Sequence, residues 1–145
     1  MVSFGYMRYK GIKGKFYAIF SEFIRKRDFK KYKGQCIACG KTKLYSEIQC
    51  GHFCPASNCG FSLLFDEENC NGECAGCNAF DEGHLIRYRQ NLITRIGEEK
   101  VKDLERRYDD HRYKGKTMKQ WTKREYEAKI LEYKEKLCKL EKTDQ

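Results

Sequence analysis

The sequence predicts a small α+β protein in which a zinc-held unit of two strands and a helix lies between flanking α-helices. Three observations lead to this prediction. The chain has two C-x-x-C pairs, Cys36 with Cys39 and Cys74 with Cys77, which is the usual way to place four thiolates tetrahedrally on zinc. The interval between the pairs is roughly twice that of a simple zinc ribbon, so it leaves room for an inserted hairpin. Apolar residues recur at helical spacing on both sides of the pairs.

The composition narrows the class of partner and the compartment. Lysine and arginine number 30 against 21 acidic residues, and the net charge of +9 favours a polyanion such as nucleic acid; the alternative is simply a highly charged surface. No run approaches the roughly 18 apolar residues of a membrane span, and the first residues lack the apolar segment of a secretory signal. The nine cysteines are odd in number and mostly at metal-type spacing, so we expect zinc and a reducing, cytoplasmic setting.

The amino-terminal part of the chain is expected to be an arm followed by a helix. Residues 1–14 are rich in lysine, tyrosine and glycine, which indicates a mobile basic arm for phosphates or a disordered end. Residues 15–30 are predicted to be a helix, which Gly34 ends. Its apolar stripe consists of Phe16, Ile19, Phe20, Phe23 and Ile24.

The middle of the chain is expected to form the zinc-held unit. Residues 44–53 and 61–65 are typical of strands, and residues 54–60, which hold the only proline, are expected to be the loop between them. Acidic residues at 66–68 then predict the start of a helix that carries the second cysteine pair. Since this segment has few aliphatic residues, zinc is expected to supply much of its stability, on the order of 10 kcal/mol.

Three helices are expected in the carboxyl-terminal region. The first covers residues 81–96, with Asp81 as its N-cap and Gly97 at its end. A short second helix and a polar linker over residues 109–116 follow. The predicted division of the whole chain is an arm and helix over 1–35, a zinc-bound core over 36–80, and a helical region over 81–145.

The last predicted helix begins at a capping box formed by Thr122 and Glu125 and runs to about Leu140. Its apolar residues have the 4, 3, 4, 3 spacing of a heptad seam: Tyr126, Ile130, Tyr133, Leu137 and Leu140. The seam either joins two copies in a homodimer or packs on the first helix of the same chain. The sequence favours neither alternative, because the seam lasts only two heptads.

Two polar residues of the middle segment are candidates for chemistry. An imidazole titrates near neutral pH and can take a proton from water, so His52 is a candidate catalytic base. A zinc ligand or a structural hydrogen bond is the alternative for His52. Asn78 directly follows the second cysteine pair, so zinc would fix its backbone, and its amide oxygen can bind Mg²⁺. The alternative for Asn78 is an ordinary residue on a helix surface.

Several segments in a fixed order resemble one protein family. They are FSEFIRKRD, CIACG, CGHF, LLFDEENCNGECAGCNAF and HLIRYRQNLITRIGEEKVKDLE, which together span about residues 20–105. These segments resemble the NinG/Rap proteins of lambdoid phages. The resemblance implies a recombination endonuclease that cuts branched DNA, such as Holliday junctions and D-loops, in the cytoplasm of the host cell.

The resemblance also implies a ββα-metal, or His-Me finger, core similar to that of endonuclease VII-type resolvases. In such a core His52 is the base, Asn69 braces the loop that holds it, and Asn78 binds a catalytic Mg²⁺ or Mn²⁺ separate from the zinc. The chain departs from the pattern at two positions. HNH-type motifs place a metal-binding aspartate directly before the histidine, where this chain has Gly51, and Leu64 stands where the family tends to have arginine.

The remaining candidate site residues are assigned as groups of alternatives. The missing acidic metal ligand is expected among Glu47, Asp66 and Glu67. Four more cysteines are either a second zinc site or ordinary buried thiols: Cys50, Cys54, Cys59 and Cys70. DNA contacts are expected from Arg25, Arg27, Arg87, Arg89 and Arg95. His84 and His111 are expected to be surface groups near the DNA.

Two functions of other classes compete with a nuclease. A non-catalytic, zinc-stabilised DNA-binding module would have the same composition, and a zinc-dependent protein adaptor is a third alternative. The set of His52, Asn69 and Asn78 favours the nuclease, because binding alone does not require it.

Overall fold

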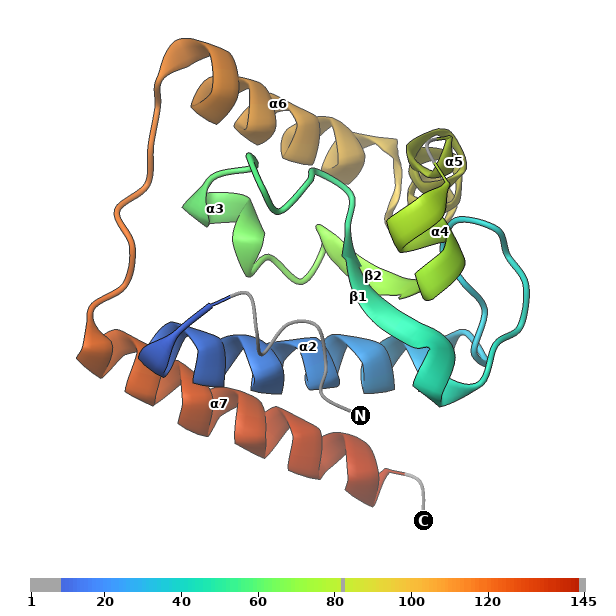
Figure 1. The fold of residues 1–145 in the computed structure, drawn as a ribbon, viewed down its shortest axis with the longest axis horizontal. Coiled ribbons are helices and arrows are strands. Elements are labelled where there is room, and N and C mark those ends of the chain that lie inside the picture. Colours follow the sequence, from blue (N-terminus) through green and yellow to red (C-terminus); the bar gives the residue numbers. More distant parts are fainter. Residues whose placement is uncertain (1–8, 82, 144–145) are drawn as a thin grey trace.

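The computed structural model describes residues 9–81 and 83–143 and shows a helix-rich α+β fold, as the sequence predicts. Two strands lie at the centre, with helices α2 and α7 along one side and α4, α5 and α6 around the other (Figure 1). None of the described helices is long and apolar enough to cross a membrane. The elements are α2 (Gly11–Lys31), η1 (Tyr45–Glu47), β1 (Ile48–His52), α3 (Phe61–Leu64), β2 (Cys70–Cys74), α4 (Ala75–Phe80), α5 (His84–Ile96), α6 (Glu98–Lys114) and α7 (Lys123–Lys142).

Helix α2 is the floor on which the strands lie. The predicted helix is confirmed and starts earlier, at Gly11, so the part of the expected basic arm that the structure describes is mostly helical. The rest of that arm, residues 1–8, lies outside the described residues. The buried face of α2 is apolar apart from a few polar residues, and among these Asp28 accepts a hydrogen bond of 2.7 Å from the backbone N–H of Gly72 in β2. A carboxylate of the helix therefore anchors the second strand.

Strands β1 and β2 form an antiparallel pair whose two faces have different neighbours. Directly opposed residues share a face, and faces alternate along each strand. One face carries His52 and Cys70 and looks towards α2, because Tyr17 of α2 stacks near the His52 ring. The other face carries Gln49 and Glu73 and meets α4 and α5.

The second strand is not where the sequence predicts it. Residues 61–65 form the one-turn helix α3 and its end, not a strand, and β2 instead covers Cys70–Cys74. A short apolar run suits either state, and here Leu63 and Leu64 reach the core from a turn of helix. The acidic residues at 66–68 form a turn before β2 and do not begin a helix. Only Cys77 of the second pair lies in a helix, since Cys74 is the last residue of β2.

The helices after β2 are also divided differently from the prediction. Helix α4 precedes α5, which begins at His84 with Gly83 as its N-cap; Asp81 is not the N-cap but accepts a hydrogen bond from the Gly83 N–H. Gly97 ends α5 with a positive φ of 92°, as expected. Helix α6 is long and runs to Lys114, so most of the predicted polar linker is helical.

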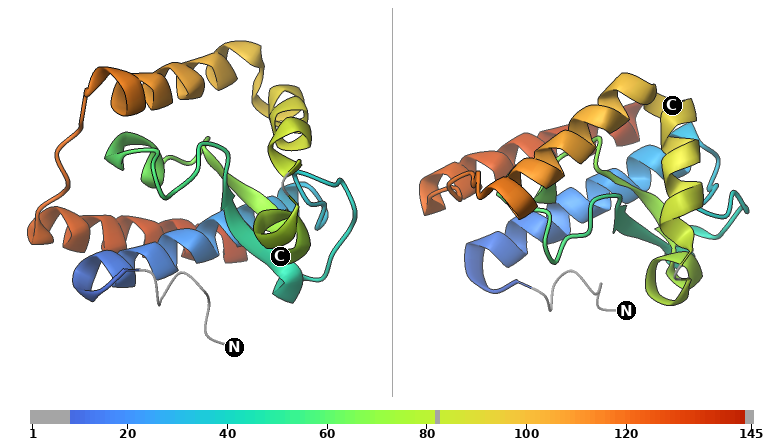
Figure 2. Two further views of the ribbon diagram at one scale, coloured as in Figure 1. Left: turned by 45° about the horizontal axis from the view of Figure 1, so that its top comes forward. Right: turned by 90° about the horizontal axis from the view of Figure 1, so that it is seen from above.

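Helix α7 packs along α2, and the two lie side by side in both views of Figure 2. The capping box of Thr122 and Glu125 is confirmed. Tyr133, in the middle of the predicted seam, contacts the rings of Phe20 and Phe23. The seam therefore packs on the first helix of the same chain, which was the second of the two alternatives. A single apolar core runs through all three predicted parts, and the boundaries at 35 and 80 stay a prediction.

Candidate metal centre and histidine site

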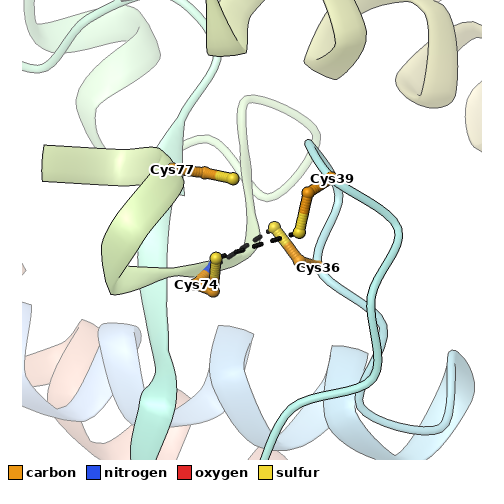
Figure 3. Close-up of side chains that lie close together, drawn as sticks. All are labelled: Cys36, Cys39, Cys74 and Cys77. Carbon is orange, nitrogen blue, oxygen red and sulfur yellow. Dashed lines mark hydrogen bonds between the residues drawn. The ribbon is translucent and has the colours of Figure 1, made fainter. Parts of the chain in front are cut away.

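Four cysteine thiols meet where the loop after α2 approaches the end of β2 and the start of α4 (Figure 3). All four sulfur atoms lie within 4.8 Å of one another, and the Sγ atoms of Cys39 and Cys74 are 4.0 Å apart. Tetrahedral zinc with Zn–S bonds near 2.3 Å places its sulfurs about 3.8 Å apart, so the spacing fits the metal. It is far longer than the roughly 2.05 Å of a disulfide.

The surroundings of the four thiols also suit a cation. Backbone N–H groups of Ala38 and Cys74 donate to the Cys36 sulfur at 3.4 and 3.2 Å. Burial raises the pKa of Cys36 and of Cys77, so the thiolate forms need a nearby positive charge. Three of these thiols and Ala38 form a small buried cluster apart from the main core of the described residues, and the partly buried Cys39 packs against it. Zinc can hold this region where apolar contacts cannot.

His52 is the last residue of β1, and its side chain is only 8% exposed. Its Nε2 atom lies 2.8 Å from the carbonyl oxygen of Leu64 in α3. A carbonyl oxygen only accepts hydrogen bonds, so Nε2 carries the proton and Nδ1 is the basic nitrogen of the neutral ring. Tyr17 stacks nearly parallel to the ring, with centroids 6.5 Å apart. The position holds the imidazole in one tautomer and one orientation.

Asn69 ties together the two ends of the segment between the strands. It is fully buried, and its Oδ1 accepts a 2.8 Å hydrogen bond from the Cys54 N–H. Its Nδ2 donates to the carbonyl oxygens of Cys54 and Leu63, at 3.2 and 3.0 Å. Cys54 lies two residues after His52, and Leu63 directly precedes the residue that His52 contacts. These bonds are of the kind that the bracing role implied by the family resemblance needs.

The four remaining core cysteines do not come together as one site. Cys50 and Cys70 share the α2 face of the hairpin with His52, and the three ligand atoms lie within 4.8 Å of one another. Cys54 instead donates to the carbonyl oxygen of Leu104, and burial raises its pKa to about 12, which suits a protonated thiol. Of the four cysteines considered for a second zinc site, Cys50 and Cys70 thus lie together with His52, while Cys54 and Cys59 are not part of that group among the described residues.

Asn78 lies on the opposite side of the hairpin from His52. It is exposed on α4, and its Nδ2 donates to Gln49 Oε1 at 2.9 Å. Gln49 precedes His52 by three residues on β1, so their side chains point to opposite faces of the pair. The structure thus does not bring Asn78 and His52 into one cluster.

Each acid proposed from the sequence as a metal ligand has partners elsewhere. Glu47 is exposed and closes the capping box of η1 through the Leu44 N–H. Asp66 accepts from the N–H groups of Glu68 and Asn69, and its other oxygen pairs with Arg107. Glu67 accepts hydrogen bonds from Tyr133 and Lys136 of α7, at 2.7 and 2.6 Å. These contacts assign all three to structure, not to the hairpin face of Asn78.

An acid that the sequence did not single out lies on that face. Glu73 of β2 is fully buried, and its Oε2 is 2.6 Å from Nδ1 of His84 at the start of α5. Burial raises the pKa of Glu73, although the neighbouring His84 opposes the rise. His84 is therefore not the plain surface group that was expected, since its side chain is 17% exposed and paired with a buried carboxylate.

The five arginines predicted to contact DNA separate into two groups. Arg27 donates to the carbonyl oxygens of Glu67 and Cys70, both at 2.9 Å, and Arg95 stacks on Tyr32 with a side chain 10% exposed. These two arginines therefore contact other parts of the fold and are not on the surface that DNA would contact. Arg87 and Arg89 are more exposed on α5, paired with Asp81 and Glu105, and half-buried Arg25 lies over the Tyr45 ring.

Comparison with known proteins places the chain in a family. The family model described as "Bacteriophage Lambda NinG protein" matches residues 8–143. The chain belongs to the NinG family. The NinG proteins of Escherichia phages 933W and lambda are each 36% identical to it over 115 residues, which is 79% of this chain. The NinG protein of Salmonella phage P22 is likewise 36% identical over 115 residues.

The match covers only part of those relatives. This NinG-family chain spans about half the length of the curated relatives it matches, 51% of the 933W protein and 50% of the lambda protein. No solved structure matches it. Family membership and a cysteine cluster that can hold structural zinc are therefore what is established for the chain.

Sequence reasoning missed two residues of this NinG-family site, Glu73 and His84. The signal was present in the alternation of the hairpin: once Cys74 ends a strand, Glu73 must point to the face of α4 and α5. The misplaced second strand hid that alternation.

Proposed function

We propose that this NinG-family chain is a metal-dependent endonuclease that cuts branched DNA, such as Holliday junctions and D-loops. The observation that carries the proposal is the placing of His52 at the end of β1, with Nε2 held by Leu64 and the surrounding loop braced by Asn69. Strand β2 and helix α4 follow, joined by the four-thiol cluster. This order of two strands and a helix is the one that a ββα-metal core requires.

The proposed reaction is hydrolysis of a phosphodiester. Nδ1 of His52 takes a proton from a water molecule, the water oxygen bonds to phosphorus, and the bond from phosphorus to the leaving deoxyribose oxygen breaks. The leaving oxygen takes a proton from solvent. A bound Mg²⁺ or Mn²⁺ supplies neutralising charge at the phosphate and the leaving oxygen. Asn78 would offer an amide oxygen to that cation from the α4 side of the hairpin, opposite the His52 side chain, so the phosphate would have to bind across the end of β1.

Affinity for DNA is proposed to come from the net charge of +9 and from exposed arginines of α5. Contacts of this kind bind phosphates with little regard to base sequence. A homodimer would supply two active sites to a two-fold symmetric junction, and it would need a surface other than the α7 seam, which α2 covers. The expected place of action is the host cytoplasm.

The matched pair of variants His52→Ala and His111→Ala tests the role of the base. His111 lies on α6, next to Gly60, and has no part in the proposed chemistry. On a labelled four-way junction, His52→Ala should cut at least about 100-fold more slowly than wild type, with zinc content and junction binding retained. His111→Ala should cut like wild type. Native cleavage by His52→Ala contradicts the assignment.

A zinc-stabilised DNA-binding module is the second candidate, and one observation favours it. Cys50, His52 and Cys70 are all buried and close enough to share one metal ion, which would make His52 a structural ligand. Measuring the zinc content distinguishes the nuclease from the binding module. A module of this kind holds two zinc ions per chain, and either Cys50→Ser or Cys70→Ser should lower that number to one. The nuclease holds one zinc ion, and these variants keep it.

A further inference from the structure

The α4 and α5 face of the hairpin contains a buried carboxylate, that of Glu73, with one oxygen that lacks a hydrogen-bond partner among the described residues. The side chain of Glu73 is fully buried, and among the described residues its Oε1 atom has no hydrogen-bond partner. A buried charged or polar oxygen without a partner is costly, and a bound ion or water is the usual explanation. The other oxygen, Oε2, is held at 2.6 Å by Nδ1 of His84. His84 thus orients Oε2, and Oε1 is left to accept a ligand.

Gly51 makes room for this carboxylate. An ideal Cβ atom placed on Gly51 would lie 2.4 Å from Oε1 of Glu73 and 2.8 Å from its Cβ. No side chain fits at position 51 while Glu73 keeps its conformation. Because Gly51 directly precedes His52, the Glu73 carboxylate lies beside the backbone of the proposed base.

Two amide side chains lie on the same face of the hairpin as the carboxylate. Gln49 is the cross-strand partner of Glu73, and side chains opposed in this way have Cβ atoms about 5 Å apart. Gln49 in turn holds Asn78 through a 2.9 Å hydrogen bond. Asn78 is exposed, and the side chain of His84, which contacts Glu73, is 17% exposed, so both residues connect this face of the hairpin with solvent.

We infer that Glu73 Oε1 and the amide oxygen of Asn78 bind a divalent cation, and that His84 is a positioning residue which orients the Glu73 carboxylate. The cation's use in cleavage rests on the proposed function, but its binding does not. Mg²⁺ and Mn²⁺ prefer oxygen ligands, and Mg²⁺ in particular is held by one or two carboxylates with several waters and substrate phosphates. A histidine that donates to a ligating carboxylate is a common outer partner of such a site.

Binding of Mn²⁺ to zinc-loaded protein, without DNA, tests this site directly. The loss of the free Mn²⁺ electron paramagnetic resonance signal on titration gives the affinity. We expect wild type to bind one Mn²⁺, and Glu73→Gln and Asn78→Ala to weaken the affinity by at least about 10-fold with zinc content unchanged. His84→Ala should weaken it similarly, and His84→Gln, which keeps an N–H donor, should recover part of the loss. Glu68→Gln, at a neighbouring half-buried acid, is the matched control and should bind like wild type.

Two results overturn the inference: a wild-type protein that binds no Mn²⁺, or a folded Glu73→Gln protein that binds it normally. If Glu73→Gln fails to fold, the half-buried His84 decides, and normal binding by His84→Ala then overturns the positioning role and the site. The failures of site and function are distinguishable. If the protein binds Mn²⁺ through Glu73 but does not cut the junction, the metal site is supported and the nuclease proposal is contradicted. If Glu73→Gln cuts the junction normally, the metal site is contradicted and the nuclease proposal is supported.

Discussion

Replacing Asn69 with alanine should destabilise the protein far more than the removal of one polar side chain normally does. The side chain makes three buried hydrogen bonds, with the Cys54 N–H, the Cys54 carbonyl and the Leu63 carbonyl. Alanine can make none of them. Each buried backbone group left without a partner costs about 1–3 kcal/mol, and relaxation towards water recovers part of this. We therefore expect the free energy of unfolding to fall by about 3 kcal/mol.

Urea unfolding of zinc-loaded protein, followed by circular dichroism, measures this loss. A fall of about 3 kcal/mol corresponds to roughly 6–12 °C in melting temperature for a chain of this size. Asn58→Ala is the matched control, because it makes the same change in the same segment between the strands, and the hydrogen bond seen for the Asn58 side chain among the described residues is a long one of 3.4 Å from Tyr108. It should cost less than about 1 kcal/mol. An equally small cost for Asn69→Ala would refute the bracing role.

Three further predictions concern zinc, acid and salt. Cys36→Ser or Cys77→Ser should lose zinc and unfold the central region, and folded wild-type protein without zinc in elemental analysis would oppose this. Despite partial burial, the hydrogen bonds from Lys136 and Tyr133 keep the pKa of Glu67 below its ordinary value, so its contribution to stability is present above the unfolded pKa and lost as pH falls through the lower folded pKa. Between roughly pH 3 and 6, around the ordinary carboxyl pKa range, the urea midpoint should therefore depend less on pH in Glu67→Gln than in wild type. The same pH dependence in both proteins would argue against this role of Glu67. Arg87→Ala and Arg89→Ala should each weaken junction binding equally across sequences and reduce the salt slope by about 1, whereas Arg27→Ala should act through stability; an unaltered slope in the first two variants would remove α5 from the DNA surface.

The sequence predicts the helices that have a clear period or cap. The stripe from Phe16 to Ile24 identified α2, and Thr122 with Glu125 placed the start of α7. In contrast, the strand Cys70–Cys74 has no β-branched or aromatic residue, so its propensity gave no signal. It is a strand because β1 pairs with it and because Asp28 and Arg27 of α2 bind its backbone.

Parts of the candidate site could be predicted from the sequence, and other parts could not. The spacing of the four zinc-type cysteines follows from local pattern, and the structure brings their thiols together. The loop-bracing role of Asn69 follows from family resemblance, and its hydrogen bond to the Cys54 N–H is of the kind that such a role needs. The separation of His52 and Asn78 onto two faces depends on strand register, which short sequence patterns do not fix. The Glu73–His84 pair joins β2 to the start of α5, a contact that only the packed fold reveals.

The function proposed for this NinG-family chain is metal-dependent cleavage of branched DNA. The most direct test incubates zinc-loaded protein with an end-labelled four-way junction and a linear duplex of the same sequence, with Mg²⁺ added or withheld. We expect cuts near the branch point only when Mg²⁺ is present, and little cutting of the linear duplex. Tight, salt-sensitive binding to the junction with no cleavage at any Mg²⁺ concentration would contradict it.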